Sequence, residues 1–149
     1  MASIDQIKEL REATGISVAE CKKALEEAGG DMAKAKEWLR QRGKEVAEKK
    51  QDRETGEGLV TSYVHGTGKV GSLVAVRCET DFVARSEDFQ NLCHELALQA
   101  ASMEAENVED LLAQEYIKDS SKTIKELIEE GVAKLGENIV VERFARFRI

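Results

Sequence analysis

The chain has 149 residues, which allows one compact domain or one small and one medium domain. A net charge of -7 argues against a broad nucleic-acid footprint, because such a surface needs a basic face. No apolar run approaches the roughly 20 residues that span a bilayer, and the first residues lack the basic-then-apolar pattern of a signal peptide. With three cysteines at no zinc-like spacing, we expect a cytoplasmic protein that binds neither a membrane nor nucleic acid directly.

Residues 1–42 predict three short amphipathic helices joined by tight turns. The first helix, expected over 3–12, begins with a capping box at Ser3, the second with a capping box at Ser17, and the third follows Asp31 as its N-cap. Such a bundle resembles the ubiquitin-associated (UBA) type of domain. The apolar faces are formed by Ile4, Ile7 and Leu10, by Val18, Cys21, Leu25 and Ala28, and by Met32, Ala35, Trp38 and Leu39.

Residues 43–57 carry a dense run of charges of both signs and predict a solvated helical extension followed by a linker. The hydrophobic period then changes from 3.6 to 2. Strands are expected over 59–65 and 70–78, joined as a hairpin by Gly66-Thr67-Gly68-Lys69.

This hairpin contains the spacing of a dinucleotide-binding fingerprint at Gly66, Gly68 and Gly71. A fingerprint of that kind must open a helix, whose N-terminus receives the pyrophosphate. Here the glycines lead into another strand, so we interpret them as hairpin residues and predict no cofactor.

The second half of the chain predicts an α+β domain over 58–149. A long helix opens at Ser86, a short helix runs from Asn107 to about Tyr116, and a further helix starts at 119–121 and stops at Gly136. A third strand is expected over 138–147. We therefore predict a small antiparallel sheet of about three strands covered by helices, with candidates such as Tyr63 or Phe147 on its outer face and open edges that invite a partner.

The segment Cys78-Glu79-Thr80-Asp81-Phe82-Val83-Ala84-Arg85 forms the corner between the second strand and the long helix. In one interpretation Phe82 caps the local core and Asp81 helps to cap the helix. In the other, the short corner holds Phe82 outward so that it can enter another molecule. The residues alone leave both interpretations open.

Four segments, taken together and in this order, closely resemble the signatures of the bacterial elongation factor Ts family, and the resemblance covers the whole chain. They are Leu10-Arg11-Glu12-Ala13-Thr14-Gly15, Cys21-Lys22-Lys23-Ala24-Leu25, Cys78-Glu79-Thr80-Asp81-Phe82-Val83-Ala84-Arg85 and Gly136-Glu137-Asn138-Ile139.

The resemblance implies a guanine-nucleotide exchange factor for elongation factor Tu that needs no metal or nucleotide of its own. Its N-terminal bundle would dock on the GTPase domain, while Asp81 and Phe82 would contact the region of the magnesium and phosphate site. Phe82 would act there as a wedge. The partner-binding residues implied by the match are Arg11, Val18, Ala19 and Lys22 on the bundle and Thr80, Asp81, Phe82 and Val83 at the corner.

Two features separate this chain from longer relatives. It has a single corner and a single sheet unit, so we predict a homodimer that forms through the open sheet. Glu142 also stands where relatives tend to carry a basic residue.

Two alternatives to an exchange factor remain at this stage. A UBA-like adapter module would bind a partner without changing nucleotide release. A small enzyme would use the glycine hairpin or the pair Cys93-His94, whereas the leading hypothesis is a binding protein that is not an enzyme. We interpret Cys21 and Cys93 as core residues, because each lies on an apolar helix face.

Overall fold

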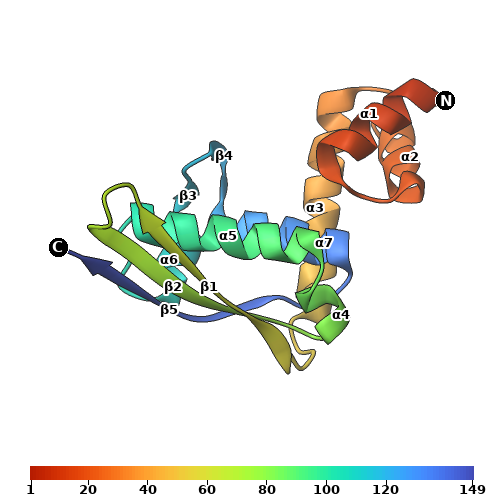
Figure 1. Ribbon diagram of the computed structural model, residues 1–149. Coiled ribbons are helices and arrows are strands. Elements are labelled where there is room, and N and C mark those ends of the chain that lie inside the picture. The colour runs from red at the N-terminus through yellow and green to blue at the C-terminus, as the bar shows by residue number, and fades with distance from the viewer.

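The structure, a computed structural model, describes residues 1–149. A helical bundle lies at the N-terminal end, and a small antiparallel sheet covered by helices lies at the other, so that the fold is α+β as predicted (Figure 1). The two ends have separate hydrophobic clusters, one of six buried residues in the bundle and one of 18 in the sheet domain. None of the helices combines the length and apolar character that crossing a bilayer requires.

The bundle consists of α1 (Ile4–Thr14), α2 (Val18–Glu27) and the first part of α3 (Met32–Lys50). The predicted caps are present, since Ser3 forms a capping box with Gln6, and Ser17 and Asp31 each accept a backbone N–H bond three residues on. The second capping box is incomplete. Glu20 turns its carboxylate toward Arg42 of α3, at 3.8 Å, instead of returning a bond to Ser17.

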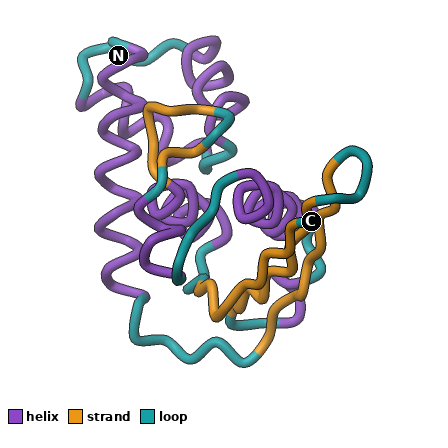
Figure 2. The backbone as a smooth tube through the Cα atoms, turned by 90° about the vertical axis from the view of Figure 1, so that its left-hand side faces the viewer, coloured by secondary structure: helices purple, strands orange, loops and turns teal.

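The α3 helix continues for 19 residues and joins the bundle to the rest of the molecule. Its second half is solvated on one side only, because Val46 and Ala47 pack against the larger core. Gly43 lies at this contact, where a Cβ atom would meet the Cβ of Ala133 at an ordinary 3.6 Å. A loop then carries the chain from the end of α3 to the sheet (Figure 2).

The sheet contains β1 (Glu57–His65), β2 (Val70–Cys78) and β5 (Val140–Arg148) in the order β1-β2-β5, all antiparallel. Gly66 and Gly68 lie in the turn between β1 and β2, and Gly71 lies within β2, so the apparent fingerprint opens no helix and the predicted hairpin is confirmed. The inner face packs on α5 (Glu87–Ser102), with α7 (Ile124–Leu135) behind it.

The prediction for the outer face was right for Phe147 and wrong for Tyr63. Phe147 is 70% exposed. Tyr63 pairs with Ser72, whose hydroxyl donates to a carbonyl of α5, so the tyrosine points inward and meets the ring of His94 edge-on at 5.9 Å. Strand β1 has apolar residues on both faces, and its alternation therefore did not indicate which set is buried.

The start of the last helix was also predicted wrongly. After α6 (Val108–Ala113), the chain forms a short hairpin from β3 (Glu115–Tyr116) and β4 (Asp119–Thr123), so the short helix ends before Tyr116. Thr123, in a capping box with Glu126, begins α7. Asp119 satisfies the backbone of Ser121 within a local turn and starts no helix.

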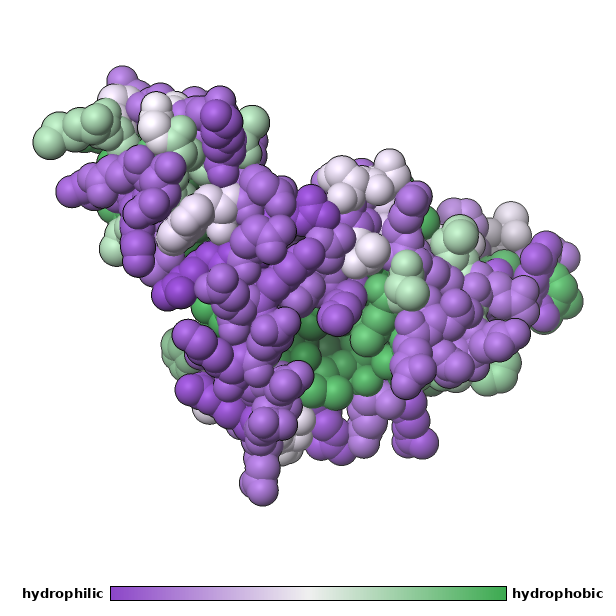
Figure 3. All heavy atoms as spheres, turned by 180° about the vertical axis from the view of Figure 1, so that it is seen from behind, coloured by the Kyte–Doolittle hydropathy of each residue, from purple (hydrophilic) through white to green (hydrophobic).

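The surface seen from behind is mostly hydrophilic. Apolar side chains gather there in a hollow between the column that ends in the N-terminal bundle and the opposite end of the molecule (Figure 3). On this side of the molecule, apolar side chains therefore reach the surface in the hollow.

Candidate protein-binding site

The corner after β2 is a single helical turn, α4 (Asp81–Ala84), that presents one large apolar side chain to solvent. Thr80 caps it by accepting the N–H of Val83 at 3.2 Å. Val83 and Ala84 are buried in the larger core, whereas Phe82 is 84% exposed. The interpretation of Phe82 as a cap of the local core is therefore wrong, and an anchored corner with an outward aromatic ring is what the fold provides.

The charges beside Phe82 are also exposed. Asp81 forms an ion pair with Arg85 one turn on, and both side chains remain largely in solvent. An exposed pair of this kind contributes little stability, about 0–1 kcal/mol, so Asp81 can exchange its partner at small cost when another molecule approaches.

A carboxylate that sequence reasoning did not single out holds the base of this corner. Glu137, just after α7, accepts the backbone N–H groups of Glu79 and Thr80 at 3.1 and 3.0 Å. Its second oxygen accepts the hydroxyl of Thr80 at 2.7 Å. The only signal for it in the sequence was its place in the segment Gly136-Glu137-Asn138-Ile139.

The four bundle residues form a second exposed surface. Val18, Ala19 and Lys22 lie on the first turns of α2, with Val18 and Lys22 four residues apart on one side of the helix, and Arg11 lies in the last turn of α1. All four are exposed. The structure thus groups the predicted residues into two patches, one on the bundle and one at α4, which lie at the same end of the molecule above and below the middle of α3 (Figure 1).

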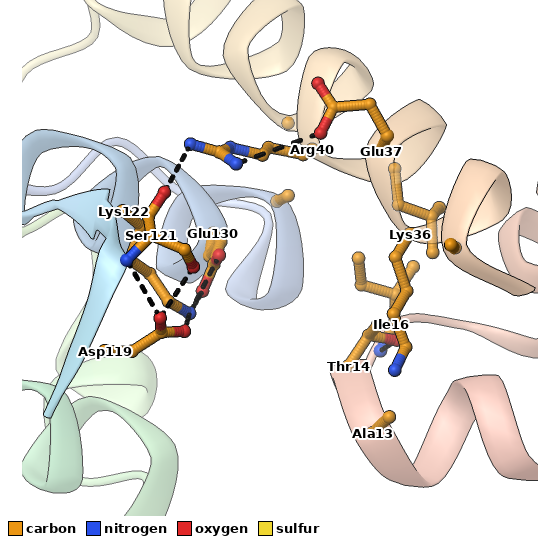
Figure 4. Close-up of a pocket in the computed structure, with 14 residues that line it drawn as sticks. Ala13, Thr14, Ile16, Lys36, Glu37, Arg40, Asp119, Ser121, Lys122 and Glu130 are labelled. Atoms are coloured by element: carbon orange, nitrogen blue, oxygen red, sulfur yellow. Dashed lines mark hydrogen bonds and ion pairs between the residues drawn. The ribbon is translucent and has the colours of Figure 1, made fainter.

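The cleft between bundle and core has a volume of about 310 Å³ and is lined by residues from the end of α1 and the turn after it, and from α3, β4 and α7. The charges on the side of β4 and α7 satisfy one another (Figure 4). Lys122 lies 3.0 Å from a carboxylate oxygen of Glu130, and Arg40 reaches across to donate to the carbonyl of Ser121 at 3.1 Å. This cleft is the joint between the two ends of the molecule.

Cys93 and His94, the pair named in the enzyme alternative, are packed against other residues of the fold, as is the neighbouring core cysteine Cys78. Burial raises the pKa of Cys93 to about 12 and that of Cys78 to about 11, so both thiols are protonated at neutral pH and are poor nucleophiles. His94 packs against Tyr63 on the exposed side of α5. Cys93 and Cys21 are fully buried, as predicted.

Comparison with known proteins gives a consistent result over both ends of the chain. A family model described as "Elongation factor TS" matches residues 79–149, and one described as "Elongation factor Ts, mitochondrial, N-terminal" matches residues 2–47. Elongation factor Ts of Coprothermobacter proteolyticus is 44% identical, with 99% of this chain and 98% of that protein covered. The Leptospira biflexa protein of the same name is 42% identical, with 99% and 97% covered.

The alignments also show that these relatives are longer than this chain. The first of these two extends over 192 positions, more than the 149 residues of this chain, so the relative contains internal residues without a counterpart here. Elongation factor Ts of a Nostoc species is 50% identical over 96% of this chain, but the match covers only 45% of that protein.

Proposed function

Because the chain belongs to the elongation factor Ts family, we propose that it binds the GTPase domain of elongation factor Tu and promotes GDP release during translation elongation. The observation that carries this proposal is the exposure of Phe82 on a corner that Val83 and Ala84 anchor in the core. An exposed aromatic ring on an ordered corner is the kind of side chain that commonly anchors a protein–protein interface.

Phe82 acts as a wedge in this proposal, with Asp81 beside it as the charged contact. Both approach the region that holds magnesium and the phosphates in the GTPase, and Thr80 and Val83 complete the contact. Interface anchors commonly contribute about 2 kcal/mol or more each, and the aromatic side chains are prominent among them. Because α4 is already ordered, little conformational freedom of the corner is lost on binding.

Thermodynamic linkage between GDP binding and exchange-factor binding sets the coupling free energy that the wedge must supply. An exchange factor binds the empty GTPase more tightly than the GDP-bound form, and GDP weakens its binding by the same factor. A thousandfold loss of GDP affinity corresponds to about 4 kcal/mol of coupling. One buried aromatic ring and one charged contact are of the right order to provide it.

The bundle supplies a docking surface. Val18 and Ala19 offer a small apolar area, and Arg11 and Lys22 place positive charge at its margin on a chain whose net charge is -7. Local cations of this kind orient an encounter more than they strengthen the final complex.

A second copy of the chain is the proposed partner of the outer sheet face. Exposed apolar residues extend across all three strands, because Val64 lies beside Gly71 and Gly71 beside Phe147, while Leu73 pairs with Ala145. Phe147→Asp should therefore give a monomer in size-exclusion chromatography with light scattering, whereas Ile117→Asp, at an exposed site outside the sheet, should leave the dimer intact. A native protein that is only monomeric at micromolar concentration would contradict this part of the proposal.

The decisive experiment is release of fluorescent GDP from elongation factor Tu, followed by stopped flow. We expect fast release with the native chain and loss of most of it with Phe82→Ala, while Met103→Ala, which truncates an exposed side chain at the end of α5, should match the native rate. Fast release with Phe82→Ala would keep the function and move the mechanism to Asp81 or the bundle. No acceleration by a folded native chain would favour the UBA-like adapter.

A further inference from the structure

Glu137 links the end of α7 to Thr80, the cap of α4, and the direction of their hydrogen bonds is informative. The Thr80 hydroxyl has one proton, which it donates to Glu137 at 2.7 Å. Its lone pairs are then free to accept the N–H of Val83 at 3.2 Å. The carboxylate of Glu137 therefore orients the hydroxyl so that it caps the turn.

A turn of four residues cannot hold itself together. Isolated helices shorter than about 12 residues are marginal in water, because nucleation costs more than one hydrogen bond returns. The shape of α4 must therefore come from its buried residues and its cap. Phe82 lies between Thr80 and Val83 in the chain, so the cap helps to set the direction in which the ring points.

Glu79 connects the corner to the segment after α7 and to the loop after α3. Its carboxylate accepts the backbone N–H of Asn138 at 2.8 Å and lies 3.6 Å from the guanidinium of Arg53. Asn138 in turn donates its side-chain amide to the carbonyl of Arg53 at 2.9 Å. The corner, the segment after α7 and the loop after α3 are thus fastened to one another.

We propose that Glu137 is a positioning residue for nucleotide exchange, which holds the Phe82 corner in its binding conformation through Thr80. This inference rests on the proposed function, and it adds a residue that contacts neither nucleotide nor the wedge itself. Without Glu137 the corner would sample other conformations, and each encounter with the GTPase would have to order it first. The apparent affinity falls by the fraction of molecules that are competent to bind.

A double-mutant cycle tests whether Glu137 acts through Phe82. We expect Glu137→Ala to lower the exchange efficiency kcat/KM at least about fivefold in the native background and less than about 1.5-fold in the Phe82→Ala background, since coupled sites are not additive. Glu109→Ala, which removes an exposed carboxylate from α6, should change efficiency in neither background. Equal losses from Glu137→Ala in both backgrounds would overturn the proposal.

Glu137→Gln provides a graded variant that keeps the size of the side chain. Its amide oxygen can still accept the two backbone N–H groups, but its NH₂ group cannot accept the hydroxyl proton of Thr80. We expect an exchange efficiency between those of the native protein and Glu137→Ala. If Glu137→Ala does not fold, the cycle is run with Glu137→Gln and the same two outcomes.

Amide hydrogen exchange of the free protein, measured by NMR, gives a readout that needs no GTPase. The amides of Thr80 and Val83 should exchange at least about tenfold faster in Glu137→Ala, while those of Val74 and Val76 in the central strand keep their protection. Unchanged Thr80 and Val83 amides would overturn the positioning role. If those amides lose protection but the native chain fails to release GDP, the positioning of the corner stands and the proposed function falls.

Discussion

Substitution of Glu126 by glutamine should destabilise the joint between bundle and core in a pH-dependent manner. Glu126 lies in the first turn of α7, and its side chain is only 14% exposed. Arg40 donates its Nε to this carboxylate at 2.8 Å, and the ammonium of Lys44 lies 3.4 Å away. Glutamine removes the charge but keeps an oxygen that can accept the N–H of Thr123, so the capping box survives.

The magnitude follows from the pKa of this carboxyl group. Burial alone would raise the pKa, but the N–H of Thr123 and the cations Arg40 and Lys44 outweigh burial and lower it to about 2. A fall from the usual 4.5 is worth about 3 kcal/mol at 1.36 kcal/mol per pH unit. Because Arg40 is 31% exposed and water screens the pair, we expect the variant to lose about 2 kcal/mol at pH 7.

The sign of the pH dependence is fixed by the lowered pKa. The unfolded chain takes up this proton first as the pH falls, so the stabilisation is complete above about pH 5 and is lost toward pH 2. Urea unfolding at pH 7 and at pH 3.5 should therefore give a difference between native and variant that is smaller by about 1 kcal/mol at the lower pH.

The matched control for Glu126 is Glu37→Gln, which removes an exposed partner of the same Arg40 at 3.8 Å and should cost less than about 0.5 kcal/mol. A Glu126→Gln loss below about 0.5 kcal/mol at pH 7, or an equal loss at both pH values, would refute the reasoning.

Two helix glycines should respond to alanine with opposite signs in urea unfolding. Gly43→Ala should raise the free energy of unfolding by about 0.5–1 kcal/mol, because its Cβ would meet Ala133 at an ordinary 3.6 Å and alanine favours the helix. Gly131→Ala should lower it by about 1 kcal/mol, because its Cβ would lie 2.9 Å from Leu92 in a packed core. Tyr116→Phe removes a hydroxyl that donates at 2.6 Å to a carboxylate of α5 and should cost about 1 kcal/mol. Equal effects of the two alanines, or no effect of the phenylalanine, would contradict these assignments.

Local patterns were sufficient for most elements of the fold. The caps at Ser3, Asp31 and Ser86 and the stop at Gly136 are where the sequence predicts them, and the second strand has the predicted bounds 70–78. Each cap and the stop depend on residues within one helical turn of each other, and the strand depends on one continuous segment. Such short-range chemistry is readable without knowledge of the tertiary fold.

The wrong predictions arose where two local patterns competed. Asp119 and Ser121 have the composition of a helix start, yet Thr123 forms the complete capping box with Glu126, three residues later. The inward side of β1 was ambiguous because apolar residues occupy both of its faces. Only the packing of α5 on the sheet determines that Tyr63 is inside.

For the candidate site, the sequence indicated the corner segment and the bundle residues, but not the exposure of Phe82 or the contact of Glu137 with Thr80. Exposure of Phe82 depends on where Val83 and Ala84 find the core, which the sequence leaves open. Glu137 lies 57 residues after Thr80, and no periodicity connects residues that far apart. Long-range hydrogen bonds of this kind are what sequence reasoning cannot supply.

The two proposed binding patches are connected through α3, and this bears on how the proposed exchange activity can work. Docking of the bundle can press the Phe82 corner against the GTPase only if the joint between bundle and core keeps its shape. The free energy that holds the joint together must then be comparable to about 4 kcal/mol, the coupling that a thousandfold effect requires. The joint contains the packing of α3 on α7 at Gly43, the charge cluster of Glu126 and a bond from Lys50 to the carbonyl of Gly136. Contributions of about 1–2 kcal/mol each are comparable in sum to that coupling. Weakening one of them should therefore reduce exchange in part, whereas in the proposed mechanism loss of Phe82 removes the wedge itself.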